Sequence, residues 1–91
     1  MLSVSCTVRT PPIYPKLSTR LGEQGKTVLL VELDDIGRVA QVTIKNSSGF
    51  PRLDEAAVNA VKSWRCTPAR RNGMPVRSFA KQPFNFALKG H

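Results

Sequence analysis

The sequence predicts an α+β fold in which a three-stranded antiparallel sheet has a short and a long helix packed on one face. Two apolar segments, residues 26–33 and 38–46, flank a turn and predict a β-hairpin. From Pro51 the apolar residues change to helical spacing, which predicts the long helix. Phe84 and Phe86 alternate with polar residues near the end and predict a third strand. The expected order is short helix, strand, strand, helix, strand.

The beginning of the chain predicts an unpacked segment followed by a domain. Residues 1–12 show no helical spacing and end in two prolines, so we expect an extended lead-in there. The domain itself is expected over residues 13–90, since the whole chain of 91 residues fits a single domain. Pro15 suits a first helical turn. A short helix is therefore predicted near residues 15–21, ended by Gly22.

The hairpin is predicted from residue types as well as from pattern. Residues 26–33 are a nearly continuous run of Val and Leu, which is typical of a central strand. Residues 34–37, Asp-Asp-Ile-Gly, have the composition of a turn. Residues 38–46 alternate, which predicts a strand buried on one side. The side chains expected to face the core are Ala40, Val42 and Ile44.

The long helix is expected to begin at Pro51, to run for about 14 residues and to end before Pro68. Its apolar stripe consists of Leu53, Ala56, Ala57, Ala60, Val61 and Trp64. Acidic Asp54 lies near its start and basic Lys62 near its end, and both placements suit the helix dipole. Such a stripe must cover a sheet to leave water.

The handedness of chain connections predicts the order of the strands. A right-handed crossover from the second strand through the long helix places the last strand, residues 76–88, beside the first. The predicted sheet order is therefore second–first–last, with all neighbours antiparallel. The last strand lies at an edge, with Phe84, Phe86 and Leu88 on its core face.

The charge of the chain is strongly asymmetric. Lys and Arg number 14 against 6 Asp and Glu, and every acid lies at or before Glu55. Such a balance is compatible with nucleic acid, anionic lipid, an acidic polymer or an acidic protein as a partner, and also with a solvated basic face. No run of 18 apolar residues predicts a membrane span, and Arg9 and Pro11 interrupt any signal-peptide pattern.

The chain lacks the residue patterns of catalytic and metal sites. His91 is the only histidine and lies at the terminus, so a Ser–His or Cys–His pair is not expected. Asp34 and Asp35 fit a turn better than an acid–base pair. Cys6 and Cys66 lack CxxC spacing, and no His/Cys cluster accompanies them. We therefore predict a protein that is not an enzyme and that holds no cofactor and no metal.

Four stretches, in this order, resemble the C-terminal domain of the TonB family of periplasmic energy transducers. They are YP at Tyr14–Pro15, the hairpin EQGKTVLLVELDDIGRVAQVTIKNSSG, the helix LDEAAVNAVKSWRCTP and the closing PFNFAL. The resemblance covers about residues 11–90. Two positions depart from the family pattern, because Cys66 stands where many members carry an aromatic residue and Pro11 where some carry a glutamine.

The resemblance implies a role in transport across the outer membrane. Such domains are the periplasmic ends of single-pass inner-membrane proteins, and they bind the TonB box of outer-membrane transporters. Force from the proton-motive complex of ExbB and ExbD passes through that contact, and siderophores, haem or cobalamin are imported. The resemblance implies no enzymatic activity and no cofactor.

The last strand is the expected docking site, because an edge strand offers unpaired backbone groups to a partner strand. Pro83 cannot donate a hydrogen bond, so its bonding groups should face away from the central strand. By alternation the outward residues are Lys81, Asn85 and Ala87, and the inward residues are Gln82, Phe84 and Phe86. The two rings are expected in the core, so the backbone of this edge is the predicted site.

The lead-in carries two further predicted contacts. Pro12, Tyr14 and Pro15 form a second candidate partner site, in which the ring of Tyr14 either packs on the domain or touches the partner. An even cysteine count in a domain that the resemblance places in the periplasm predicts a disulfide between Cys6 and Cys66. The alternative is two free thiols, with Cys66 buried in place of the family's aromatic residue.

Two other functions stay open at this stage. A TolA-like periplasmic interaction domain has a related architecture, although YP and the SSG…LD stretch favour TonB. A nucleic-acid-binding module is suggested by charge alone, and no RNP, KH or zinc-finger pattern supports it, so no nucleic acid is expected. Anionic peptidoglycan is a further expected contact of the basic half. Exposed edge strands also favour a homodimer in short fragments.

Overall fold

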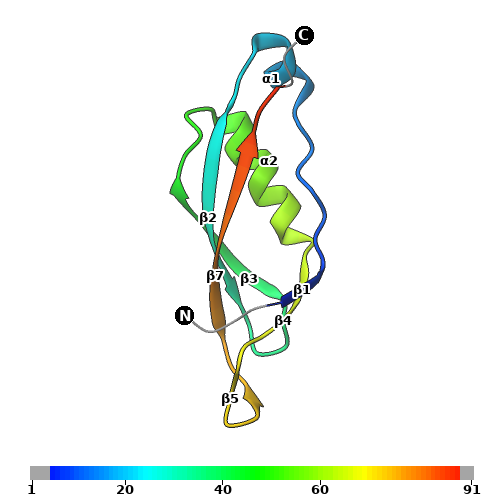
Figure 1. The fold of residues 1–91 in the computed structure, drawn as a ribbon, viewed down its shortest axis with the longest axis vertical. Coiled ribbons are helices and arrows are strands. Elements are labelled where there is room, and N and C mark those ends of the chain that lie inside the picture. The colour runs from blue at the N-terminus through cyan, green and yellow to red at the C-terminus, as the bar shows by residue number, and fades with distance from the viewer. Residues whose placement is uncertain (1–4, 89–91) are drawn as a thin grey trace.

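A three-stranded sheet forms the body of the molecule (Figure 1). The computed structural model describes residues 5–88, and His91 lies outside them. Its elements are β1 (Ser5–Val8), α1 (Lys16–Leu21), β2 (Gly25–Leu33), β3 (Val39–Asn46), α2 (Pro51–Lys62), β4 (Arg65–Thr67), β5 (Arg70–Arg71), β6 (Met74–Pro75) and β7 (Ser78–Phe86). The sheet order is β3–β2–β7 and both pairings are antiparallel, so the predicted fold class and topology are confirmed.

The central strand β2 separates a covered face of the sheet from an open one. Thr27, Leu29, Val31 and Leu33 alternate along it as buried residues on the face that α2 covers (Figure 1). The residues between them are only half-buried, because no helix covers the opposite face in the described part of the chain. Leu53, Ala57 and Val61 of α2 complete the core, which extends to Trp64 and Phe86.

The second strand differs from its prediction. Val42 packs against the core as expected, but Ala40 is exposed, Ile44 is 44% exposed, and Val39 packs against the core instead. The cause of the change at Val39 and Ala40 is a shift of register, because Glu32 pairs with Gln41 whereas Leu33 pairs with Val39. Ala40 is the extra residue of this bulge, and alternation is reversed beyond it.

Two pairs of short strands were not predicted. Part of the expected lead-in, Ser5–Val8, is extended but pairs with Arg65–Thr67, and Arg70–Arg71 pairs with Met74–Pro75 in a small hairpin. The long helix ends at Lys62, earlier than expected, because the chain must turn at Trp64 to enter β4. Strands of two to four residues give no alternation long enough to detect in a sequence.

The β2–β3 turn is fixed from both sides. Asp34 accepts hydrogen bonds from the backbone N–H groups of Ile36 and Arg38, at 3.0 and 2.8 Å. Gly37 has a φ of +88°, and a Cβ there would lie 1.8 Å from the carbonyl oxygen of Cys66. Glycine is therefore required at this contact between the turn and β4.

Helix α1 lies at one end of the long molecule and the β5–β6 hairpin at the other (Figure 1). The principal extents of the fold are 51 × 21 × 19 Å. The buried Glu23 holds α1 in place, since it accepts a hydrogen bond from Ser18 at 2.7 Å and an ion pair from Arg52 of α2 at 2.9 Å.

Candidate functional site: the free edge of strand β7

Strand β7 has a strand neighbour on one side only among residues 5–88. It pairs with β2 without interruption, from Gly25 opposite Phe86 to Leu33 opposite Ser78, and no register shift occurs along these nine pairs. Its outer edge is therefore long, regular and free of bulges. Such an edge presents a row of unpaired N–H and C=O groups that a second strand can use.

The direction of the backbone groups follows from two observations. Pro83 lies opposite Val28 within the regular ladder, and a proline that cannot donate fits only where its nitrogen faces away from the neighbouring strand. Just beyond the strand, the N–H of Leu88 donates to the side chain of Gln24 at 2.9 Å, and Gln24 immediately precedes β2. Even-numbered residues thus face β2, and Lys81, Pro83 and Asn85 face outward.

The aromatic residues of β7 belong to the core. Phe86 is only 4% exposed and meets the ring of Tyr14 edge-on, with centroids 5.5 Å apart. Phe84 is half-buried and contacts Trp64 in the same manner at 5.8 Å. These rings stabilise the position of the strand, and they leave the backbone as the group that a partner can reach.

The side chains beside the free edge are mostly exposed. Lys81, Pro83 and Asn85 point away from the core face, and Ala87 is exposed but lies one residue beyond the end of β7. Gln82 is half-buried, and its side-chain oxygen accepts a hydrogen bond from Arg9 at 3.0 Å. The predicted docking residues from Lys81 to Phe86 thus lie on β7, and Ala87 follows the strand directly.

The lead-in lies against the domain between β1 and α1. The indole N–H of Trp64 donates to the carbonyl oxygen of Thr10 at 2.8 Å, and the guanidinium group of Arg9 lies 5.0 Å from the Trp64 ring centre. The hydroxyl of Tyr14 donates to the carbonyl oxygen of Glu23, and Pro15 directly precedes α1. The half-buried ring of Tyr14 is therefore packed on the domain.

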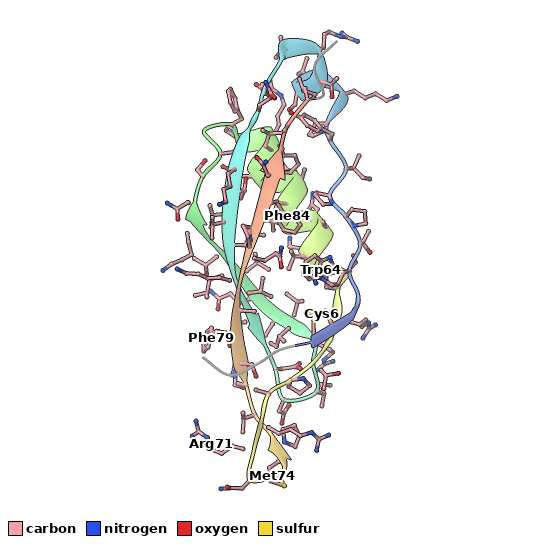
Figure 2. All side chains as sticks on the ribbon, viewed as in Figure 1. Cys6, Trp64, Arg71, Met74, Phe79 and Phe84 are labelled. Atoms are coloured by element: carbon pink, nitrogen blue, oxygen red, sulfur yellow. A yellow bond between two sulfur atoms is a disulfide. The ribbon has the colours of Figure 1, made fainter. Side chains whose placement is uncertain are left out.

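A disulfide fixes the other end of the lead-in. Cys6 and Cys66 lie opposite each other in the β1–β4 pairing, and their sulfur atoms are bonded. The bond links positions 60 residues apart in the sequence. Figure 2 shows Cys6 below Trp64, at the point where the lead-in meets β4. Cys66, which stands where the pattern described in the sequence analysis has an aromatic residue, thus binds the lead-in covalently.

Asp54 has a role that the sequence did not reveal. It is 7% exposed and accepts hydrogen bonds from Thr27 of β2, from Ser47, and from both the N–H and the hydroxyl of Ser48. Burial alone would raise its pKa, but these hydrogen bonds outweigh burial and hold the pKa below its usual value. Asp54 therefore binds the β3–α2 loop to the central strand.

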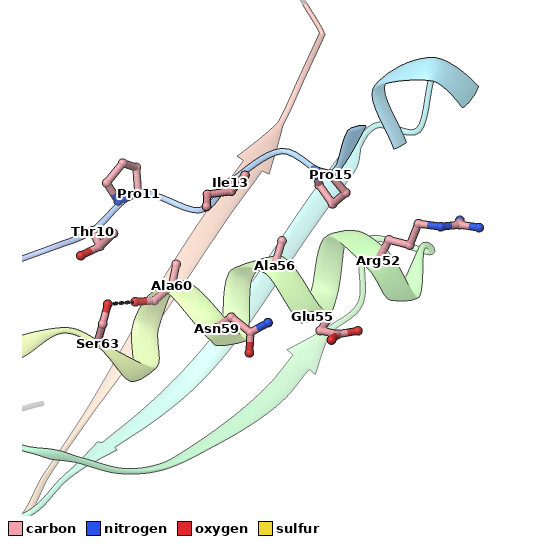
Figure 3. A pocket seen from close by; sticks show the side chains of 10 residues that line it. All are labelled: Thr10, Pro11, Ile13, Pro15, Arg52, Glu55, Ala56, Asn59, Ala60 and Ser63. Carbon is pink, nitrogen blue, oxygen red and sulfur yellow. Dashed lines mark hydrogen bonds between the residues drawn. The ribbon is translucent and has the colours of Figure 1, made fainter. Parts of the chain in front are cut away.

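A groove of about 480 Å³ separates the lead-in from the exposed flank of α2 (Figure 3). Pro11 and Ile13 form one wall, and Ala56 and Ala60 the other.

The described residues contain no group of His, Cys, Asp and Glu side chains arranged to hold a metal ion. None of the helices in residues 5–88 is long and apolar enough to span a membrane.

Comparison with known proteins relates this chain to a family. Residues 10–88 match the model of the Gram-negative bacterial TonB protein C-terminal. A Protein TonB of Xanthomonas campestris pv. campestris is 34% identical over 96% of this chain, and Protein tonB2 of Pseudomonas aeruginosa is 36% identical over 85% of it. The aligned regions make up 39% and 28% of those proteins, so the chain spans well under half of each relative.

A solved structure shares the fold. The solution NMR structure of the Pseudomonas aeruginosa TonB CTD superimposes with a TM-score of 0.80, covering 97% of this chain and 89% of that one, at 23% identity. The family match extends from the lead-in to the end of β7 and includes every element of the free edge. The chain belongs to the family of TonB C-terminal domains.

Proposed function

We propose that this domain is the transporter-binding domain of a TonB energy transducer and that it binds the TonB box of outer-membrane transporters, which would be added as a strand to β7. The main support is the regular outer edge of β7, which runs from Ser78 to Phe86 without a bulge. Strand addition needs such an edge, because the backbone hydrogen bonds supply affinity while contacts of alternate side chains supply specificity.

The added strand would use the groups that face away from β2. It would bond to the N–H and C=O groups of Lys81 and Asn85 and to the carbonyl of Pro83, with Ala87 extending the contact beyond the strand. Gln82, Phe84 and Phe86 would support it from the core side. The lead-in residues Pro12, Tyr14 and Pro15 would contribute by holding α1 and the end of β7 in place.

The remainder of the role follows from the family. The domain would work in the periplasm as the end of a single-pass inner-membrane protein, and ExbB and ExbD would act through the part that precedes it. The transported compounds would be siderophores, haem or cobalamin. A disulfide between Cys6 and Cys66 suits an oxidising compartment of this kind.

Titration of the domain with a TonB-box peptide tests the proposal directly. We expect saturable binding with one peptide per domain, and chemical-shift changes concentrated on Lys81, Asn85 and Ala87. A scrambled peptide of equal composition serves as the control, and size-exclusion chromatography establishes whether the domain is a monomer or a homodimer. Absence of binding, together with capture of colicin or phage proteins, would favour a TolA-like interaction domain instead.

A further inference from the structure

The β5–β6 hairpin, defined here as residues 70–75, is the part of the molecule that projects beyond the sheet at the end opposite α1 (Figures 1 and 2). Every one of its residues is exposed. Asn72 and Gly73 form its turn with positive φ angles of 52° and 78°. No other described element lies beyond the turn along the long axis, so the hairpin can meet a flat surface without a clash.

The hairpin is cationic, and neither of its arginines takes part in the ion pairs of the described residues. No acid occurs between Ala56 and Leu88. The ion pairs within the described residues engage Arg38, Arg52 and Arg77. Arg70 donates a hydrogen bond to the carbonyl oxygen of Gly73 at 3.1 Å, which keeps its full charge, and Arg71 takes part in none of these ion pairs.

An apolar side chain accompanies these charges. Met74 is 67% exposed and lies directly opposite Arg71 in the hairpin, so the two side chains share one face. Phe79, also on the open side of the molecule, is 49% exposed (Figure 2). Arg70 pairs with Pro75, so its side chain lies on the other face of the hairpin. A flexible apolar side chain beside Arg71 at the exposed tip matches the interface of a bilayer, where phosphates attract the cations and the thioether enters the headgroup layer.

We propose that the β5–β6 hairpin docks the domain on an anionic lipid bilayer. An acidic polymer would satisfy Arg70 and Arg71, but it has no apolar layer for Met74, and this is why the observations favour lipid. The contact is expected to be weak, because the hairpin has only two arginines and each arginine near an anionic surface increases the partitioning of the domain onto vesicles roughly fivefold. It leaves the edge of β7 free, so this inference stands whether or not a TonB box binds there.

Co-sedimentation with vesicles tests the inference. We expect the domain to bind vesicles of phosphatidylglycerol and phosphatidylcholine, to ignore pure phosphatidylcholine, and to lose binding as salt increases. The pair Arg70→Ala and Arg71→Ala should reduce partitioning roughly 25-fold. Met74→Ser keeps the charge and should reduce it about tenfold, because it removes only the inserted apolar group.

Matched controls separate the hairpin from net charge. Lys16→Ala with Arg20→Ala removes the same charge from exposed positions of α1, at the other end of the molecule, and should leave partitioning within twofold of the parent. All variants should keep the parental melting temperature and TonB-box affinity. Equal losses of vesicle binding for both pairs of variants would overturn lipid docking and indicate a purely electrostatic contact. The same conclusion would follow if Met74→Ser bound vesicles as the parent does and still bound peptidoglycan sacculi.

Discussion

Strands β3 and β7 both lie at edges of the same sheet, but only one of these edges is regular. Along β3 the pairing with β2 shifts register twice, leaving Lys45 and Ala40 without partners in the ladder. Along β7 it never shifts. A bulge twists a strand and interrupts the row of bonding groups that an incoming strand would need. The difference therefore explains why one edge suits strand addition and the other resists it.

The two edges are also stabilised in different ways. Near the end of β3, the loop is held by the buried carboxylate of Asp54 and its hydrogen bonds to Ser47 and Ser48. The β7 side is held by aromatic contacts, from Tyr14 of the segment that precedes α1 to Phe86 and from Trp64, which follows α2, to Phe84. The edge proposed to bind the partner thus depends on residues that are distant from β7 in the sequence. Substitutions on the two sides of the sheet should therefore affect stability and peptide binding separately.

The largest effect is expected from Phe86→Pro. This change removes a ring that is 4% exposed and an N–H that faces β2, so we expect a loss of more than about 5 kcal/mol and an unfolded domain. Circular dichroism and thermal unfolding measure it. A folded variant with a cooperative transition near that of the parent would show that Phe86 does not bond inward.

Removal of the disulfide should have the next largest effect. Cys6→Ser with Cys66→Ser opens a link between positions 60 residues apart, and the chain-entropy model gives a loss of about 4 kcal/mol. The indole N–H of Trp64 should also exchange faster, because the lead-in that accepts its hydrogen bond is released. Thermal unfolding with and without reductant measures the first effect, and NMR hydrogen exchange the second.

The oxidised parent provides the decisive control for the disulfide. When it is unfolded without reductant, a thiol reagent should detect no free cysteine. Two titrating thiols per chain would disprove the bond, whatever the stability of the double variant.

Asp54→Asn tests the polar support on the β3 side. It removes the charge that four donors share, and we expect a loss of about 2 kcal/mol at pH 7. Because the pKa of Asp54 is lowered by folding, its contribution is complete above pH ~4 and is lost as the pH falls through the folded value. Denaturant unfolding between pH 7 and pH 2 should show this loss in the parent and less of it in the variant.

Asp34 and Asp35 are needed to interpret the result for Asp54→Asn. Burial raises the pKa of Asp34, but hydrogen bonds from Arg38 and Ile36 lower it more, so the Asp54→Asn variant should keep part of the pH dependence. The exposed Asp35 is the matched control, and Asp35→Asn should leave the stability at pH 7 unchanged. An Asp54→Asn variant with the parental profile would contradict the assigned role.

The sequence predicted the elements that are long and periodic. β2, α2 and β7 each extend over nine or more residues, β2 as a nearly continuous apolar run and α2 and β7 with a clear repeat, and the handedness of the crossover then predicted the strand order. The bulge at Ala40 could not be predicted, because its side chain is compatible with either face and the shift depends on pairing with β2. The expected stripe of β3 was wrong at Ala40 for the same reason, whereas Val42 packs against the core as predicted.

The candidate site could be proposed from the sequence to the extent that it depends on the backbone alone. Pro83 allowed the direction of the bonding groups of β7 to be predicted, because the missing N–H of proline is a constraint that acts locally. The contacts that hold the strand could not be inferred, since Tyr14 meets Phe86 and Trp64 meets Thr10 across more than 50 residues of sequence. Asp54 was interpreted only as a helix-dipole residue, because its partners on β2 and in the preceding loop become neighbours only on folding.

The smallest effect, and the one that decides between the two edges, concerns Asn85→Pro. Asn85 is exposed and its N–H faces away from β2, so the variant should stay folded with a melting temperature close to that of the parent. It should nevertheless bind the TonB-box peptide about tenfold more weakly, because one backbone hydrogen bond to the added strand, about 1.4 kcal/mol, is lost. Isothermal titration calorimetry measures the affinity.

Ile44→Pro is the same substitution on the other edge. Ile44 pairs with Leu29, which bonds toward β7 through Gln82, so the N–H of Ile44 also faces outward and its loss should not unfold the domain. If β7 receives the partner, this variant should bind the peptide as the parent does. The reverse result, parental affinity for Asn85→Pro and a tenfold loss for Ile44→Pro, would move the docking site to β3. It would also mean that the bulges at Ala40 and Lys45 do not protect that edge.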